Sequence, residues 1–499
     1  MVKRGSITVF LALTLSLIMS LLCSGIESVR MAAARTQILN GLDIGLYSLF
    51  GQFDKALLED YDLFAIDGSN GGKEMDLASV YDHLESYMKP VLKQNSQKLS
   101  LTQGGITGYR LLTDEGGEVF YQQVVQYMEE TLGSQGVQLL LQKMQERQKK
   151  TSEAERAGEE VENGSTLTEY DSEINAAAQK SQEALEEKKE QSASEEGSYP
   201  DGGADGFADV ETVTEKAENP IPVIKRIRWM GLLELVVPAG KGISDKEINK
   251  RELISGRKLE ESRLPMAESL KKNRSLTSQL LYQQYLAQKL GSYANPGKGG
   301  LRYQIEYIIS GKDSDEGNLK SIAKKLLLVR EGINAACLSA DSGKRAQVEA
   351  LATAIASGFL IPPTAGIIEA ALILCWAFAE SILDVRTLFD GGKVPLIKNS
   401  SNWQLSLQNL PHLLELLDST RRSDENGMSY EDYLQVFLYS TSKEIKVMRG
   451  MDMLELSMCS RGGWESFRLD LCITSLEASV DVKANGSKTF TVTRQYSYI

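Results

Sequence analysis

Residues 6–26 form an unbroken apolar run, and no other feature constrains the fold of this chain as strongly. Lys3 and Arg4 precede the run, and no charged residue lies within it. A helix that rises about 1.5 Å per residue crosses the roughly 30 Å hydrocarbon core of a bilayer over this length. Because Lys and Arg collect on the cytoplasmic side, we expect residues 1–5 inside and the rest of the chain outside. The sequence therefore predicts a single-pass protein of the cell membrane with an extracytoplasmic C-terminal part.

Two other interpretations of the apolar run are open. A cleaved signal peptide has an apolar core of about 7–15 residues that ends at a small-x-small site. This run is longer, and Cys23-Ser24-Gly25 is the small cluster near its end. A lipoprotein would be processed before Cys23, but Leu21 and Leu22 are larger than the residues expected there. An uncleaved transmembrane helix is therefore favoured.

A short basic leader ending in Gly5 precedes the run, and four polar residues follow it at Glu27, Arg30, Gln37 and Asp43. In these features the N-terminus resembles the minor pseudopilins of Tad (tight-adherence) pilus systems. The resemblance implies cleavage after Gly5 by a prepilin-type peptidase and assembly through helix–helix contacts. Pilins also carry a glutamate early in the apolar segment, where this chain has Val9 and Phe10.

Several later stretches carry a second resemblance, at residues 303–312, 318–320, 328–334, 376–381, 394–398 and 430–434. They resemble an uncharacterised family of membrane-anchored proteins that is linked to Tad-type pilus loci in Gram-positive anaerobes. This resemblance implies that the partners are the lipid bilayer and other membrane proteins of a pilus or secretion system. It supplies a context and no chemistry.

The remaining sequence predicts an α+β fold that is mainly helical. One helix is expected from residue 6 to about 58, because Ile38, Leu42, Leu46 and Leu49 recur at helical spacing beyond the membrane. Strands are expected at 61–67, 232–237, 303–310, 467–473, 478–482 and 489–493, and Asn485-Gly486 predicts an antiparallel hairpin between the last two. Further helices are expected at 75–94, 114–149, 276–291, 317–338, 344–361 and 364–384, and a capping-box pattern at Ser244 predicts a short one.

The charge distribution divides the chain into regions. Residues 151–220 hold 20 Asp and Glu against 5 Lys and Arg, a net charge of −15, whereas the whole chain has −13. We therefore expect an acidic disordered linker at 150–219. It separates a membrane-proximal α+β region at 27–149 from a mainly helical domain at 220–465, and C-terminal β-strands occupy 466–499. No basic face with interleaved aromatics is found, so a nucleic-acid partner is not expected.

Catalytic patterns are missing from the sequence. Two histidines are present, His83 and His412, and neither belongs to a triad or a metal-ligand spacing. Glu369 and Glu380 lie within about 20° of each other around the predicted helix at 364–384, and they are expected to be buried and bound to Arg386 or Lys398. The alternative function is an envelope hydrolase that uses these two acids on cell-wall polymers. We expect no cofactor, no metal and no enzymatic activity.

The five cysteines carry one further prediction. Cys459 and Cys472 are the pair expected to form a disulfide, because disulfides are permitted outside the membrane and both residues lead into predicted strands. Cys375 lies in an apolar run and is expected to be a buried thiol. The apolar helix at 364–384 is expected to be a core helix, with a second membrane contact as its alternative.

Overall fold

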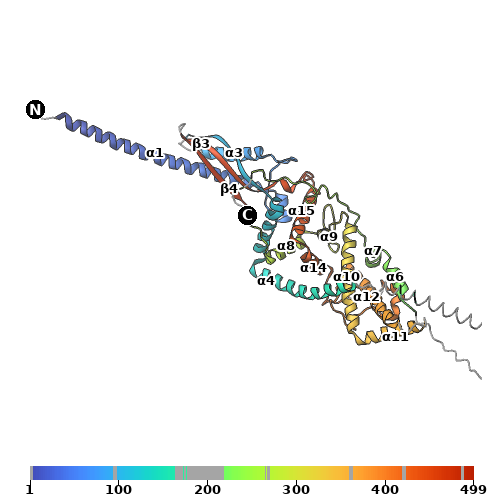
Figure 1. Ribbon diagram of the computed structural model, residues 1–499. Helices are drawn as coiled ribbons and strands as arrows, with labels where there is room; N and C mark the ends of the chain where they lie inside the picture. The colour runs from blue at the N-terminus through green and yellow to red at the C-terminus, as the bar shows by residue number, and fades with distance from the viewer. Residues whose placement is uncertain are drawn as a thin grey trace, which may run out of the picture.

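The computed structural model describes residues 4–93, 98–162, 218–264, 270–358, 364–418, 423–484 and 488–498, together with residues 172, 176 and 266. The molecule is elongated, and the first helix projects from one end as an arm with the N-terminus at its tip (Figure 1). The fold is mainly helical with an antiparallel sheet that includes the C-terminal strands, as the sequence predicts.

The described helices and strands follow in chain order. The first half contains α1 (Arg4–Phe50), α2 (Lys55–Tyr61), β1 (Ile66–Asp67), α3 (Leu77–Lys93), β2 (Leu99–Leu111), α4 (Asp114–Glu162), α6 (Ile221–Arg228), α7 (Leu232–Val236) and α8 (Leu276–Lys289). The second half contains α9 (Gln304–Ser310), α10 (Asp315–Ala340), α11 (Ser342–Gly358), α12 (Ala365–Phe389), α13 (Leu413–Leu416), α14 (Tyr430–Ser440), α15 (Lys443–Cys459), β3 (Cys472–Ala484) and β4 (Lys488–Ser497), with short 3₁₀ turns at Leu407–His412 and Leu469–Leu471.

A small core lies at the base of the arm, between α1, α3 and the sheet (Figure 1). β3 is the central strand and pairs antiparallel with β2 on one side and with β1 and β4 on the other. The predicted stripe on α1 is buried there, since Ile38 and Leu42 are 0% exposed. From β3, Leu476, Val480 and Val482 face the same core because alternate residues of a strand share a face. The two ends of the chain therefore build one unit.

The larger core lies among the helices from α4 to α15, and α2 also contributes to it. The predicted helix at 364–384 is α12, which packs between α10 and α11 and is buried along most of its length. The interpretation as a core helix is thus supported. The predicted region 27–149 contributes to both cores, because α4 packs against α8, α10 and α15.

The first helix ends earlier than predicted, and the strand predicted at 61–67 is short. α1 stops at Phe50, and α2 begins separately because the Asp54 carboxylate accepts the N–H of Leu57 at 2.9 Å as an N-cap. Asp62 closes α2 in the left-handed region with φ 54°. The chain turns after α1 and again after α2. Of the residues in the predicted strand, Ile66 and Asp67 pair with β3.

Two other predicted strands are helices, and one predicted helix is absent. Most of residues 232–237 and 303–310 form α7 and α9. A mostly apolar run as short as 232–237 has no period that separates a strand from a helix. At 303–310 the alternation of Gln304 and Glu306 with apolar residues is misleading, because both polar side chains are buried. Gly311 ends α9 with φ 65°. The capping-box pattern at Ser244 opens no helix, and Glu247 instead pairs with Ser314 in an isolated bridge. The strand predicted at 467–473 contains a 3₁₀ turn at Leu469–Leu471, and its last two residues begin β3.

Strand β2 was not predicted, although it pairs with β3 over its whole length. α4 continues to Glu162, so residues 150–162 of the predicted linker are helical, and most of its remainder lies outside the described residues. Pro362-Pro363 and Asn485-Gly486 also lie outside them. The predicted hairpin is nevertheless present, because Ala484 of β3 is paired with Lys488 of β4.

Candidate functional site

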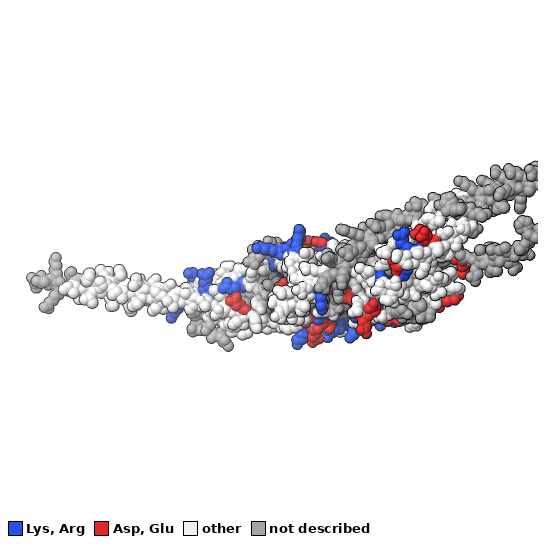
Figure 2. Space-filling view, turned by 90° about the horizontal axis from the view of Figure 1, so that it is seen from below, with Lys and Arg blue, Asp and Glu red and all other residues white. Residues whose placement is uncertain are grey.

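The arm of α1 is the most exposed apolar surface in the described part of the chain. Its large apolar side chains are exposed to solvent: Phe10 is 66%, Leu17 70% and Leu21 71% exposed. In Figure 2 the arm is white along its described length up to its base, where the first charged residues appear. The helix from Ile7 onward is long and apolar enough to cross a membrane, by length and composition. Such an N-terminal helix suits a membrane anchor or a signal sequence.

Two of the polar residues that follow the arm, Gln37 and Asp43, contact other elements. The Gln37 side chain donates to the backbone oxygen of Val91 in α3 at 3.5 Å. Asp43 pairs with Arg494 of β4 at 3.1 Å. The side chains on one face of α1 become buried from Ala34 onward, and Ala34 itself is 2% exposed. The same 47-residue helix therefore changes from a bare apolar arm into a core element without a break.

Glu380 is buried as predicted, and its partner is Lys398, one of the two that the sequence suggested. The Lys398 ammonium contacts the Glu380 carboxylate and lies 2.5 Å from Asp384. The backbone N–H groups of Gln404 and Leu405 each donate to one Glu380 oxygen at 2.9 Å. Burial is the main cause that raises the pKa of Glu380, and the charge of Lys398 opposes it. Both carboxylate oxygens of Glu380 thus accept hydrogen bonds from groups of the protein.

Arg330 and Asp384 complete this cluster and were not singled out in the sequence. Both side chains are 0% exposed, and Nη2 of Arg330 lies 2.9 Å from Oδ2 of Asp384. Asn334 donates to the same Asp384 oxygen at 2.9 Å. The charges of Lys398 and Arg330 lower the pKa of Asp384 against the opposing effect of its burial. No sequence period marks these residues, because the two helices that carry them meet only in the folded chain.

Glu369 does not share the environment of Glu380, which corrects the prediction that both are buried. Its side chain is 26% exposed and lies 3.8 Å from Arg345. Arg386 binds neither acid, because it donates to the carbonyls of Leu235 and Val237 and pairs with Asp418. Glu369 and Glu380 therefore do not meet in one cleft, and Glu380 faces a packed helix interface.

The predicted disulfide between Cys459 and Cys472 is not formed, and both are free thiols. Each contacts a backbone oxygen, Cys459 that of Phe467 at 3.3 Å and Cys472 that of Arg468 at 3.6 Å. Burial raises the pKa of Cys459 to about 11 and also raises the pKa of Cys472 well above its usual value. Thiols held this way carry little thiolate, so they exchange slowly. Cys375 is buried and free, as expected.

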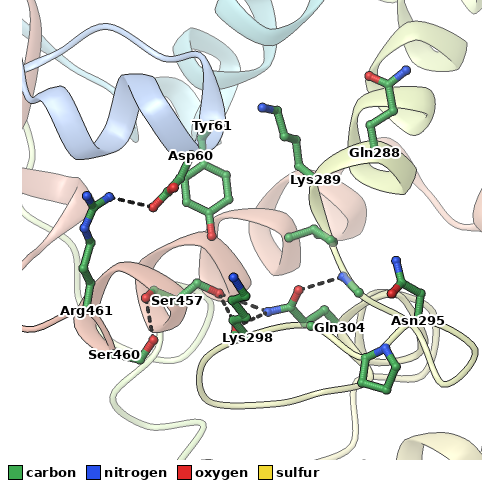
Figure 3. Close-up of a pocket in the computed structure, with 14 residues that line it drawn as sticks. Asp60, Tyr61, Gln288, Lys289, Asn295, Lys298, Gln304, Ser457, Ser460 and Arg461 are labelled. Carbon is green, nitrogen blue, oxygen red and sulfur yellow. Dashed lines mark hydrogen bonds and ion pairs between the residues drawn. The ribbon is translucent and has the colours of Figure 1, made fainter.

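A polar pocket of about 640 Å³ lies where α2, the end of α8, the loop after it and the end of α15 meet (Figure 3). The Gln304 side chain connects two sides of the pocket. Its oxygen accepts the N–H of Gly291 at 2.9 Å, and its nitrogen donates to the Ser457 hydroxyl at 3.0 Å. Asp60 is the carboxylate in its lining, and it is paired with Arg461 at 2.9 Å. The pocket offers amides, hydroxyls and Lys298, which suits hydrogen bonding more than acid–base chemistry.

The other residues considered for chemistry lie apart. His83 and His412 are both exposed. Among the residues that the structure describes, no group of His, Cys, Asp and Glu is placed to hold a metal ion. Gly5 lies in the first turns of α1, ahead of the arm.

Comparison with known proteins finds a family match for the second half of the chain. A family described as "Family of unknown function (DUF5702)" matches residues 210–484, which include every described element from α6 to β3. No curated protein and no solved structure matches the chain. The match leaves out α1 to α4 and β4, so the arm lies outside the matched part. Because the match spans more than half of its residues, this chain belongs to the DUF5702 family of unknown function.

Proposed function

We propose that this protein is a membrane-anchored, extracytoplasmic structural or assembly component, accessory to a Tad-like pilus or secretion apparatus. The observation that carries the proposal is the continuity of α1. Its arm is apolar and exposed, and its second half is buried under the sheet built from both ends of the chain. A helix anchored in this way holds the external part at a fixed distance and orientation from the bilayer.

The proposed topology follows from the charges at the two ends of the arm. Lys3 and Arg4 lie before it and would stay in the cytoplasm. Everything after the arm would then lie outside in a single-pass arrangement. In Figure 1 the helices α6, α7, α11 and α12 lie toward the end of the molecule opposite the arm, so they would be farthest from the membrane.

The arrangement around α1 also supports the pilus context. A long N-terminal helix whose second half is covered by an antiparallel sheet is how pilin-like subunits are built. This is an analogy of fold and carries no mechanism by itself. It agrees with the resemblance of the first residues to minor pseudopilins, and it makes helix–helix contacts of α1 the proposed means of assembly.

A pair of matched variants tests the anchor. Leu17→Arg places a charge in the middle of the arm, where a helix-centre arginine costs about 2.5–3.5 kcal/mol on insertion scales. Ile44→Arg adds the same charge on the same helix at a side chain that is 47% exposed beyond the arm. We expect Leu17→Arg to leave the membrane fraction and Ile44→Arg to stay in it. Retention of Leu17→Arg would contradict the proposed anchor.

A cross-linking experiment tests the assembly role. A photoreactive residue at Tyr47, which is 69% exposed on α1, would be introduced into the full chain in its native cells. We expect adducts with peptides from pilin-like or secretion-system membrane subunits. The same probe at Leu139 of α4, which is 56% exposed and away from α1, serves as the control. Equal adducts from both positions, or adducts without such subunits, would contradict the assembly role.

A further inference from the structure

Four charged side chains are sealed between α10, α12 and the loop that follows α12. Arg330, Glu380 and Asp384 are 0% exposed and Lys398 is 5% exposed. The idealised cost of moving such ions out of water is large, and only close pairing offsets it. Removing two of the four charges while leaving a balanced pair would lower that cost.

We propose that Lys398 and Glu380 condense to an intramolecular amide bond, so that this cluster is a covalent cross-link site. The inference is independent of the proposed membrane role. Lys amines are nucleophiles when they are desolvated, and the Lys398 nitrogen is in contact with the Glu380 carboxyl group. Holding two reacting groups together in a fixed geometry replaces an encounter in solution and accelerates their reaction strongly.

The surrounding backbone holds Glu380 as an electrophile. The N–H groups of Gln404 and Leu405 donate to the two different Glu380 oxygens, each at 2.9 Å. Donors placed in this way stabilise negative charge that develops on a carboxyl oxygen under attack. The indole N–H of Trp376 donates to the backbone oxygen of Leu405 at 2.8 Å and so fixes this segment.

The loop that carries Lys398 is held in position by Arg330. One guanidinium nitrogen of Arg330 donates to the backbone oxygens of Pro395 and Leu396, both at 3.0 Å. Lys398 follows these residues closely, and its ammonium lies 5.5 Å from the centre of the Trp403 ring. The aromatic wall and the burial of all four side chains exclude bulk water, which would otherwise compete with the amine.

Asp384 is placed to move the proton. Its Oδ1 lies 2.5 Å from the Lys398 nitrogen, while its Oδ2 accepts from Arg330 and Asn334. A proton first passes from the ammonium to Glu380, which gives an amine and a neutral carboxylic acid. The nitrogen lone pair then attacks the Glu380 carboxyl carbon. Asp384 takes a proton from the nitrogen and returns it to the departing hydroxyl, and one C–O bond breaks with loss of one water molecule.

The product keeps the buried charges balanced. Arg330 and Asp384 remain as a pair with 2.9 Å between Nη2 and Oδ2. The new bond would tie the loop after α12 to that helix across 18 positions of the sequence. It would also be the covalent link of a chain in which Cys459 and Cys472 are free thiols.

The mass of the purified full chain tests the proposal. We expect the wild type to be lighter than its sequence by one water molecule, relative to the Lys398→Arg variant, whose guanidinium is not nucleophilic at this position. Peptide mapping should recover Lys398 and Glu380 in one branched peptide. Recovery of both residues in separate linear peptides, at full mass, would overturn the cross-link.

Two controls assign the roles. Asp384→Asn keeps the shape of the side chain and removes the proton carrier, so we expect its chains to be mostly unlinked. A branched peptide through Asp384 in place of Glu380 would overturn the assignment. Lys443 and Glu118 are the internal control, because they are 2.7 Å apart and no second acid among the described residues is paired with this lysine. We expect their peptides to be separate, and a branch there would show that close pairing alone is sufficient.

Discussion

Phe50, the last residue of α1, packs against Tyr498, the last residue that the structure describes, with 4.8 Å between the ring centroids. The Tyr498 hydroxyl donates to the Phe50 backbone oxygen as well. Tyr496 packs on the same Phe50 ring at 4.7 Å. These contacts connect the end of the first helix to the last strand. The buried end of α1 is therefore held by residues that are more than 400 positions away in the sequence.

Replacing Tyr498 should weaken this connection. We expect Tyr498→Ala to lower the free energy of unfolding by about 2 kcal/mol, below the roughly 3–5 kcal/mol of a fully buried aromatic residue. Leu139→Ala truncates a side chain that is 56% exposed on α4 and should change the free energy by less than about 0.5 kcal/mol. Urea unfolding of the full chain in detergent measures both. Equal losses would show that the contact with Phe50 contributes nothing.

Valine substitutions at two neighbouring glycines of β2 should have different effects on stability. A Cβ atom at Gly104 would lie 1.9 Å from the Tyr81 hydroxyl and 3.0 Å from Val480, whereas none lies within 4 Å at Gly105. We expect Gly104→Val to cost about 1–3 kcal/mol through overpacking between α3 and the sheet. Gly105→Val should be neutral or slightly stabilising, because β-branched residues favour strands. Thermal unfolding of the two variants compares them, and an unaffected Gly104→Val would contradict the packing of α3 on β2.

These glycines also explain why the sequence concealed this strand. Gly104, Gly105 and Gly108 interrupt the alternation that marks a strand, and β2 gains its order by pairing with β3. The stripe on α1 was predicted because a helix lying on a core repeats its apolar residues every three or four positions. Lys398 was correctly named as a partner of Glu380, since both are near in sequence. Arg330 is 54 positions from Asp384, so only the packing of α10 on α12 brings them together.

Glu306 should make stability depend on pH. Its side chain is fully buried, and burial raises its pKa to about 7, although the Tyr293 N–H and the Tyr430 hydroxyl both donate to Oε1 at 2.7 Å. The unfolded chain releases this proton near the usual pKa of 4.5. The free energy of unfolding should therefore fall as pH rises from 4.5 to about 7, by roughly 3 kcal/mol, and then level off.

The variant Glu306→Gln separates this effect from other titrations. Glutamine keeps the acceptor oxygen and carries no charge, so the variant should lose this part of the pH dependence and gain stability at pH above 7. Glu415→Gln is the control, because the Glu415 side chain is 79% exposed. Urea unfolding at several pH values measures all three proteins. If Glu306→Gln followed the wild type across this range, the buried carboxyl group would not be the cause.

The most direct test of the membrane anchor is N-terminal sequencing, with intact mass, of the protein from native membranes. We expect the membrane-bound protein to retain residues 6–26. A start at Ser6 would further support prepilin-type cleavage after Gly5, and a start at Met1 would leave a permanently anchored accessory protein. A protein that begins beyond residue 24 and is recovered outside the membrane fraction would contradict the anchor and the proposed role together.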